Sequence, residues 1–426
     1  MKSRMAFWAG VFGFLLVFRT SAFADTRVLE ILGNPNRVIA GMNLNADVQN
    51  LNAKEPARYG IVWQRAFINV FKYQEVEEAL AEGRPLGPFQ KLTKKRLDAL
   101  DVLQTNSQFR TFISLKWDFA GYGRRVPQPN SVEENRLFEL ALRMIRRFGV
   151  KATVIALGNE PMLETLPEDL INLTEAQFGI AEPNPAARFY RRLAGVVNTE
   201  LIRLNIRQNK IMLLGALNLL QYDGKVQSDF VKRTMWIAND ADYIDGVDLH
   251  IHMDSMESFE RYLRNVREVY PHYNKMLTVS EYSLVWAFRR NFLSPACQGA
   301  VAGAYCQDVG IPQNAREIDV LNLALQKPPV AKFGPSEWAR FYRTRSYLPS
   351  HFLLNADSLF AQYGVSLSTY AGYSDATQLN YVVEDVPWVY NGLFCKGTIR
   401  ARPDGTTAAN PYFMDDFVQL YRGQAD

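Results

Sequence analysis

Short apolar runs alternate with longer amphipathic segments from residue 38 onward. The short runs have the length of β-strands, and the longer segments carry apolar residues at helical spacing. The predicted strands lie near Val38–Met42, Ile61–Arg65, Thr111–Leu115, Thr153–Leu157, Lys210–Leu214, Gly246–His250, Leu277–Glu281 and Val365–Tyr370. The predicted helices between them include Glu133–Arg147, Pro185–Asn205, Met256–Glu268 and Ser336–Tyr363. This alternation is typical of a parallel sheet whose strands are joined by crossover helices.

Eight strands with intervening helices favour a closed (β/α)8 barrel, predicted as a single domain over residues 25–426. No glycine-rich phosphate loop follows the first strand, which argues against an open nucleotide-binding sheet. The chain contains no repeat, low-complexity stretch or linker that would divide it. A long insertion, Trp286–Lys332, follows the seventh strand. On this fold the insertion belongs to the active-site rim, where it either shapes a substrate cleft or is a disordered decoration.

The first 24 residues have the pattern of an export signal. Lys2 and Arg4 precede an apolar stretch, Ala6–Phe18, and Ala22-Phe23-Ala24 offers a small-residue cleavage site. We therefore expect a signal peptide over residues 1–24 and a periplasmic or secreted product, the alternative being an uncleaved anchor. No later segment reaches the ~20 apolar residues of a membrane span.

The net charge of the chain adds little to this interpretation. The chain has 48 Lys and Arg against 44 Asp and Glu, and removal of Lys2, Arg4 and Arg19 leaves 45 against 44, a formal charge of +1. This balance gives no reason to expect a nucleic-acid partner.

The chain has three cysteines. Cys297 and Cys306 lie in a glycine-containing loop, so an oxidising compartment predicts a small disulfide loop there. Cys395 is left over and is expected to be buried. No Cys/His spacing resembles a zinc site.

Two glutamates stand at the ends of predicted strands. Glu160 closes the run after the fourth strand, and Glu281 closes the seventh strand. The carboxyl ends of parallel barrel strands are where such folds keep their catalytic groups. Two carboxyl groups are enough to break a glycosidic bond, one as proton donor and one as nucleophile. A single strand-end glutamate is common and by itself decides nothing.

With its neighbours, this pair resembles the clan A glycoside hydrolases, the retaining (β/α)8 enzymes. Asn159-Glu160-Pro161 resembles the fourth-strand motif of the clan, and Glu281 in Thr278-Val279-Ser280-Glu281-Tyr282 is similar to its seventh-strand nucleophile. Arg65 matches the arginine of the second strand, and His250-Ile251-His252 resembles the His-x-Tyr of the sixth strand, with His252 in place of Tyr.

The resemblance implies a role for each residue. Glu160 would be the general acid/base and Glu281 the nucleophile, with the two carboxyl groups roughly 5–5.5 Å apart. Arg65 would keep Glu281 ionised, although it could instead form a salt bridge at the rim. Proximity to the charge of Glu281, with partial burial, would keep Glu160 protonated. Asn159 would offer a donor and an acceptor to the sugar 2-hydroxyl.

His250 and His252 would support the substrate side of the site, and Asp248 shares their parity along the strand. A metal site built from these three residues lacks a partner at fixed spacing, so no metal and no cofactor are expected.

The aromatic platforms depart from the clan pattern. The eighth strand ends without the Trp that many members carry, and Tyr370, Tyr373 or Trp388 could supply the stacking face instead. Trp117 follows the third strand, as either a sugar platform or packed core. The sequence thus predicts an exported retaining glycosidase acting on a β-linked poly- or oligosaccharide, with a bacterial exopolysaccharide as one candidate substrate. Transglycosylation by the same pair and a non-catalytic carbohydrate-binding barrel are the alternatives.

Overall fold

The computed structural model describes residues 26–33, 37–173, 183–226, 228–269, 275–326, 333–373, 378, 380–394, 402 and 404–422. The predicted signal peptide and Cys395 lie outside these residues. Within the described ranges, no helix is both long enough and apolar enough to cross a bilayer.

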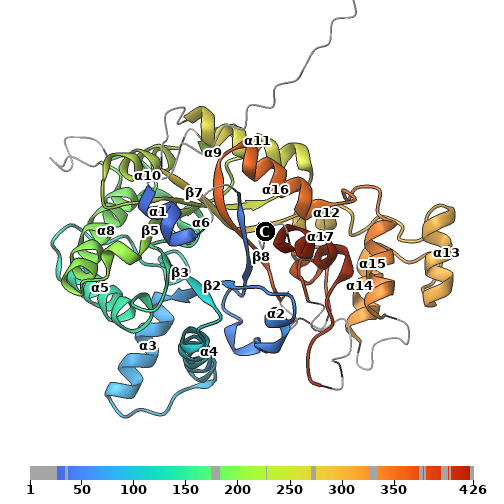
Figure 1. The fold of residues 1–426 in the computed structure, drawn as a ribbon, viewed down its shortest axis with the longest axis horizontal. Coiled ribbons are helices and arrows are strands. Elements are labelled where there is room, and N and C mark those ends of the chain that lie inside the picture. The colour runs from blue at the N-terminus through green and yellow to red at the C-terminus, as the bar shows by residue number, and fades with distance from the viewer. Residues whose placement is uncertain are drawn as a thin grey trace, which may run out of the picture.

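Eight parallel strands of the described chain close into a barrel in sequence order, with β8 paired to β1 (Figure 1). They are β1 (Ile39–Asn43), β2 (Trp63–Asn69), β3 (Arg110–Lys116), β4 (Val154–Ala156), β5 (Ile211–Leu217), β6 (Gly246–His252), β7 (Met276–Ser283) and β8 (Val365–Ala371). Each overlaps a predicted strand, so the (β/α)8 prediction is confirmed. β2 runs on to Asn69, four residues beyond its predicted end at Arg65.

Helices surround this barrel (Figure 1). They are α1 (Thr26–Leu32), α2 (Lys54–Arg58), α3 (Val70–Ala81), α4 (Pro88–Thr105), α5 (Val132–Met144), α6 (Pro161–Glu164), α8 (Pro185–Arg203), α9 (Asp223–Val226), α10 (Asp229–Asp240), α11 (Met256–Val269), α12 (Val285–Arg290), α13 (Ala300–Val309), α14 (Glu317–Leu325), α15 (Pro335–Arg343), α16 (Phe352–Gln362) and α17 (Pro411–Arg422). A π-helical turn follows α5 at Ile145–Gly149, and short 3₁₀ turns lie at Val48–Asn50, Pro167–Asp169, Arg207–Asn209 and Trp388–Tyr390.

Local chemistry explains where the crossover helices begin. The Ser131 hydroxyl accepts a hydrogen bond from the backbone of Glu134 at the start of α5, and Asn184 caps α8 ahead of Pro185 in the same way. At the opposite end of the barrel from the strand tips, Val28 and Leu32 of α1 pack with inward side chains such as Phe112. α1 therefore closes the bottom of the barrel, and the other end is left for the site.

The insertion after β7 is a group of helices beside the barrel (Figure 1). Its described part, 286–326, contributes buried residues such as Phe292 and Leu321 to the main core, so the disordered alternative is wrong for that part. Cys297 and Cys306 are joined by a disulfide whose Cα atoms are 5.8 Å apart. The single helix predicted over Ser336–Tyr363 is divided into α15 and α16 around Pro349, which cannot donate a backbone hydrogen bond.

Candidate active site

The strand ends bring the predicted polar residues to one place at the mouth of the barrel. Arg65 comes from β2, Glu281 from β7, and His250 and His252 from β6, while Asn159 and Glu160 follow β4. Strands in a closed parallel barrel all point the same way, so their carboxyl ends converge there. Trp117 and Tyr370 are the predicted residues that the fold does not bring to the mouth.

Two glycines allow the segment that carries Asn159 to lie against β5. A Cβ atom on Gly158 would stand 1.8 Å from the carbonyl oxygen of Gly215, a distance that no side chain tolerates. The close approach lets the Asn159 carbonyl accept a hydrogen bond from the Ala216 amide at 2.8 Å. This contact between the segment after β4 and the backbone of β5 fixes the position of Asn159 and Glu160 at the mouth.

Arg65 is fully buried and ties three strand ends together. Its Nη1 donates to Glu281, and its Nη2 donates to Asn159 Oδ1 at 2.7 Å. Its Nε and Nη2 both donate to Ser114 Oγ, at 3.2 and 3.1 Å. These contacts fit the predicted role of Arg65 as the residue that supports the nucleophile. They are not those of an exposed salt bridge at the rim. Ser114, on β3, was not singled out from the sequence.

The ionised form of Glu281 is favoured by its neighbours. Burial alone would raise the pKa of Glu281, but positive charge on His250 and Arg65 lowers it, and the net shift is downward. Burial holds the pKa of His250 well below its usual value and so favours the neutral ring, whereas the charge of Arg65 is permanent and favours the ionised form of Glu281.

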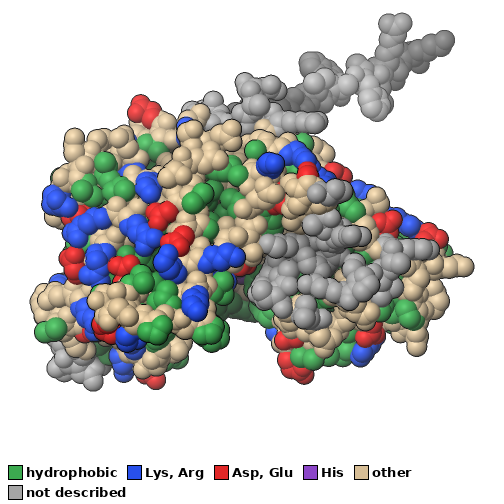
Figure 2. Space-filling view, turned by 90° about the horizontal axis from the view of Figure 1, so that it is seen from below, with side chains coloured by type: hydrophobic (Ala, Val, Ile, Leu, Met, Phe, Trp, Pro, Cys, Tyr) green, Lys and Arg blue, Asp and Glu red, His purple; other side chains and the backbone are tan. Residues whose placement is uncertain are grey.

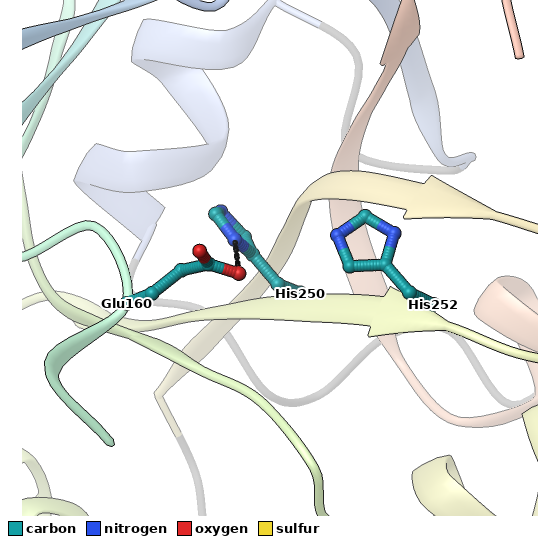
Figure 3. A group of neighbouring side chains, drawn as sticks. All are labelled: Glu160, His250 and His252. Atoms are coloured by element: carbon teal, nitrogen blue, oxygen red, sulfur yellow. Dashed lines mark hydrogen bonds and ion pairs between the residues drawn. The ribbon is translucent and has the colours of Figure 1, made fainter. Parts of the chain in front are cut away.

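Glu160 is held by a neighbouring imidazole. Its Oε1 lies 3.2 Å from His250 Nδ1 and 3.5 Å from Asn218 Nδ2, and 22% of its side chain is exposed. Figure 3 shows Glu160 pointing at His250 from the opposite segment, with His252 farther along the same strand. His250 Nε2 also lies 3.6 Å from Glu281 Oε1, so both carboxyl groups flank one ring.

A bulge in β7 adds a further partner, Ser280, to His250. Leu249 pairs with Val279 but His250 pairs with Glu281, so Ser280 is an extra residue on β7. Ser280 Oγ lies 3.1 Å from His250 Nε2 and donates to Asp248 Oδ2 at 2.5 Å. The bulge lets Ser280 and Glu281, adjacent in sequence, both face the barrel interior. The usual alternation of side chains along a strand predicts that two adjacent residues face opposite sides, so the sequence pattern does not predict this arrangement.

Asp248 ends this chain of hydrogen bonds. Its Oδ1 accepts from Thr278 Oγ1 at 2.6 Å and from the Ser280 amide at 3.0 Å. Burial raises the pKa of Asp248 to about 6, although the Arg65 charge and the bonds from Ser280 and Thr278 oppose the rise. Asp248 shares the parity of the two histidines as predicted, but its oxygens face these hydroxyl groups.

A group of three possible metal ligands occurs in the described chain: Glu160, His250 and His252, whose ligand atoms lie within 4.8 Å of one another. Hydrogen bonds already explain their positions. His250 is engaged as above, and His252 Nδ1 lies 2.9 Å from Ser283 Oγ. Its Nε2 faces Glu281 Oε2 at 3.8 Å. We interpret the group as an acid–base assembly and assign no metal ligand.

Glu164 is a site residue that the sequence interpretation missed. One of its oxygens accepts from Asn159 Nδ2 at 2.8 Å, from the Glu160 amide at 3.1 Å and from Lys116 Nζ at 3.0 Å. Burial raises the pKa of Glu164 to about 7 against the opposing charge of Lys116. Since Arg65 can only donate, it holds the Asn159 oxygen while Glu164 holds the nitrogen, and the amide orientation is fixed. Asn159 therefore has one Nδ2 hydrogen left for a substrate hydroxyl. The sequence signal that could have identified Glu164 is a carboxylate four residues after Glu160.

The predicted sugar platforms at Trp117 and Tyr370 are wrong, because both rings are fully buried. Trp117 packs edge-on against Phe71 and Phe189, and its Nε1 donates to the Leu157 carbonyl at 3.0 Å. Tyr370 packs against Tyr282 at 5.1 Å between the barrel and its helices.

Trp388 places an aromatic ring at the mouth. Its ring meets His252 edge-on at 5.0 Å and is 38% exposed, whereas Tyr373 is buried and bonded to Glu55. Of the residues proposed to replace the missing platform, only Trp388 offers an exposed face beside the site.

Solved barrel enzymes share this architecture at low identity. Xylanase 10B from Thermotoga maritima is 10% identical, with a TM-score of 0.43, over 94% of this chain and 98% of its own. An endo-1,4-β-D-mannanase from Thermotoga petrophila RKU-1 is 10% identical, with a TM-score of 0.41, over 80% of this chain and 90% of its own. A β-glucosidase from Thermotoga maritima is 13% identical, with a TM-score of 0.35, over 56% of this chain and 66% of its own. No family model matches the chain, and no curated protein sequence does. Likeness at this level carries no argument about activity, and the barrel assignment rests on the strand pairing itself.

Proposed function

We propose that this protein is an exported retaining glycoside hydrolase that cleaves a β-linked poly- or oligosaccharide. One observation carries the proposal: two carboxyl groups flank His250, and only Glu281 is bound by the buried Arg65. Double displacement needs this difference between its two carboxyl groups, one ionised to attack and one able to donate a proton.

In the first step, a Glu281 oxygen attacks the anomeric carbon and the glycosidic C–O bond breaks. Glu160 gives its proton to the departing oxygen. Arg65 keeps Glu281 ionised and aimed at the carbon, because its guanidinium is held by Ser114 and Asn159. A glycosyl ester on Glu281 results.

In the second step, Glu160 has no proton and acts as the base. It takes a proton from water as the water oxygen attacks the anomeric carbon, and the ester bond to Glu281 breaks. The anomeric configuration is inverted twice and so retained. The remaining Nδ2 hydrogen of Asn159 is available to a hydroxyl group on the reacting sugar.

The two alternative functions, transglycosylation and carbohydrate binding without catalysis, would use this site differently. A transglycosylase would use the same ester and replace water by a sugar hydroxyl. A non-catalytic binding barrel would have no use for a buried arginine directed at one carboxyl group. Export follows from the pattern of residues 1–24 alone and is part of the proposal.

The test is turnover of a panel of aryl β-glycosides and β-linked oligosaccharides by the parent protein and by Glu281→Gln. Glu268→Gln, on the exposed side of α11, is the matched control because it makes the same chemical change far from the mouth. We expect turnover by the parent and the control and none by Glu281→Gln.

Proton NMR during turnover should show the β-anomer as the first product. Release of the α-anomer first would contradict Glu281 as nucleophile. Binding of oligosaccharides without turnover by both the parent and Glu281→Gln would favour the binding barrel. Longer products formed when acceptor sugars are added would favour the transglycosylase.

A further inference from the structure

A basic cleft opens from the proposed active site. It has a volume of about 510 Å³ and is lined by His252, Asp254, Arg261, Trp286, Arg289 and Arg290, among others. His252 belongs to both regions, since its Nε2 is 3.8 Å from Glu281 Oε2. A sugar chain whose reacting unit contacts Glu281 would therefore continue into this cleft.

Two of the three arginines that line the basic cleft, Arg261 and Arg289, are not balanced by a carboxylate of the described residues. Arg290 forms an ion pair with Asp254. Arg261 donates to Ser258 Oγ at 3.3 Å, and its buried Nε has no hydrogen-bond partner. Arg289 donates to the carbonyl of Glu384 at 3.0 Å. Among the described residues, no carboxylate oxygen lies within 4.0 Å of Arg261 or Arg289.

The partly buried guanidinium groups of Arg261 and Arg289, beside one cleft, are suited to bind an anion. A buried N–H without a partner costs free energy that a bound acceptor recovers, and a planar carboxylate matches the arginine fork with two hydrogen bonds. The Trp286 ring lies next to them, with the Arg289 guanidinium 5.5 Å from its centroid. Aromatic surface beside cationic groups suits a sugar ring that carries a carboxylate.

The face formed by α3, α4 and α5 does not show the same imbalance. Figure 2 shows basic and acidic side chains interspersed over the face formed by α3, α4 and α5. Their ion pairs include Arg136 with Glu78 and Arg147 with Asp101. The two unpaired arginines of the basic cleft therefore contrast with the paired charges of this face.

We propose that the basic cleft binds the carboxylate of a uronic acid unit, so that the substrate is an acidic β-glycan. This inference rests on the proposed function, because the cleft adjoins the catalytic pair. Arg261 and Arg289 hold the carboxylate, and the Trp286 ring packs against the sugar that bears it. A neutral glycan in the same place leaves both guanidinium groups without an anion, so we expect it to bind more weakly.

The test compares matched oligosaccharides: a β-linked oligouronide, the same oligosaccharide with its carboxylates reduced to hydroxymethyl groups, and a sulfated form of that neutral one. Calorimetric binding to Glu281→Gln is measured alongside kcat/KM of the active protein. We expect the oligouronide to bind and react about a hundredfold better than its reduced form.

Arg261→Gln and Arg289→Gln should each reduce this preference about tenfold or more, with the folded state checked by near-ultraviolet circular dichroism. Arg264→Gln is the matched control, one helical turn from Arg261 on α11 and paired with Glu268, and should keep the full preference.

Equal or better use of the reduced oligosaccharide would overturn the inference and leave the proposed function standing. A preference for the sulfated form over the oligouronide would overturn the assignment of the anion as a carboxylate. Binding of the oligouronide without hydrolysis by the parent would instead contradict the proposed function.

Discussion

Glu160 Oε1 and His250 Nδ1 lie 3.2 Å apart, and this contact places the proposed acid/base at one end of a continuous hydrogen-bonded chain. From His250 the chain continues through Ser280 to Asp248. Ser280 has one hydroxyl hydrogen. When it donates to Asp248 and His250 Nε2 donates to the Ser280 oxygen, Nδ1 is left to accept a hydrogen bond from Glu160. When Asp248 holds the proton, Ser280 donates to Nε2 and Nδ1 donates to Glu160, an arrangement in which Nε2 also accepts from Arg65 Nη2 at 3.4 Å. The chain thus joins the protonation of Glu160 to that of Asp248.

Replacing His250 should damage the acid/base step more than the attack. We expect His250→Ala to lower kcat about a hundredfold on a substrate with a poor leaving group, because Glu160 loses the ring that orients it. A substrate whose leaving group departs without a proton should be affected less in the glycosylation step. His351→Ala, at an exposed histidine, is the control and should leave both rates unchanged. Equal losses on both substrates would show that His250 acts on Glu281 instead.

Asp248 should make stability fall as pH rises. Burial raises its pKa from 3.8 to about 6, against the Arg65 charge and the bonds from Ser280 and Thr278, while the buried Tyr262 also faces it. The folded protein thus binds this proton more tightly than the unfolded chain does. The stabilisation is complete below pH 3.8 and is lost as pH rises through about 6.

Asp248→Asn removes this titration and imitates the protonated form. Relative to the parent, the variant should gain about 2 kcal/mol of unfolding free energy between pH 4 and pH 7. Urea unfolding at a series of pH values measures it. Asp240→Asn, exposed on α10, controls for the loss of one negative charge. A constant difference between Asp248→Asn and the parent over this range would contradict a raised pKa for Asp248.

The sequence predicted the strands better than the directions of their side chains. Glu160 and Glu281 could be placed at the mouth because carboxyl ends of parallel strands always converge. Trp117 and Tyr370 could not be placed, since an aromatic residue near a strand end faces either the mouth or the helices, and register decides. Here both face the helix layer. Ser280 was missed because a bulge, which leaves no pattern in a single sequence, turns it inward.

Trp388 should bind substrate as the exposed ring at the mouth. Trp388→Ala should raise KM about tenfold on an oligosaccharide and change kcat less, because stacking acts on the ground state and the transition state alike. Trp236→Ala is the matched control, since Trp236 is 42% exposed against 38% for Trp388 but lies on α10, away from the mouth. An unchanged KM for Trp388→Ala would remove the ring from the binding surface.

The Cys297–Cys306 disulfide should stabilise the insertion. It closes a short loop, for which the chain-entropy estimate is about 2–3 kcal/mol. The chain has three cysteines, so the protein unfolded without reductant should react with one equivalent of thiol reagent, and with three after reduction. The double variant Cys297→Ser and Cys306→Ser should unfold at lower urea concentration. Labelling of three equivalents before reduction would contradict an oxidised pair.

The two glutamates should be distinguishable by rescue chemistry. Glu160→Ala should still form the glycosyl ester from a substrate with a good aryl leaving group, because that group needs no proton. Hydrolysis of the ester then limits turnover, and azide should restore the rate and give the β-glycosyl azide, since a small anion needs no base. Glu281→Ala should lose turnover with good and poor leaving groups, by several kcal/mol of transition-state stabilisation.

Any azide rescue of Glu281→Ala should give the α-glycosyl azide instead. The anion would enter from the face that Glu281 vacates, and the configuration would be inverted once. Product configuration, read by proton NMR, therefore identifies the side of the sugar on which each carboxyl group acts. Glu268→Gln controls for the loss of an exposed carboxylate and should need no rescue. If both alanine variants kept parental rates, the catalytic pair would lie elsewhere, and the bond from Arg65 to Glu281 would serve the fold alone.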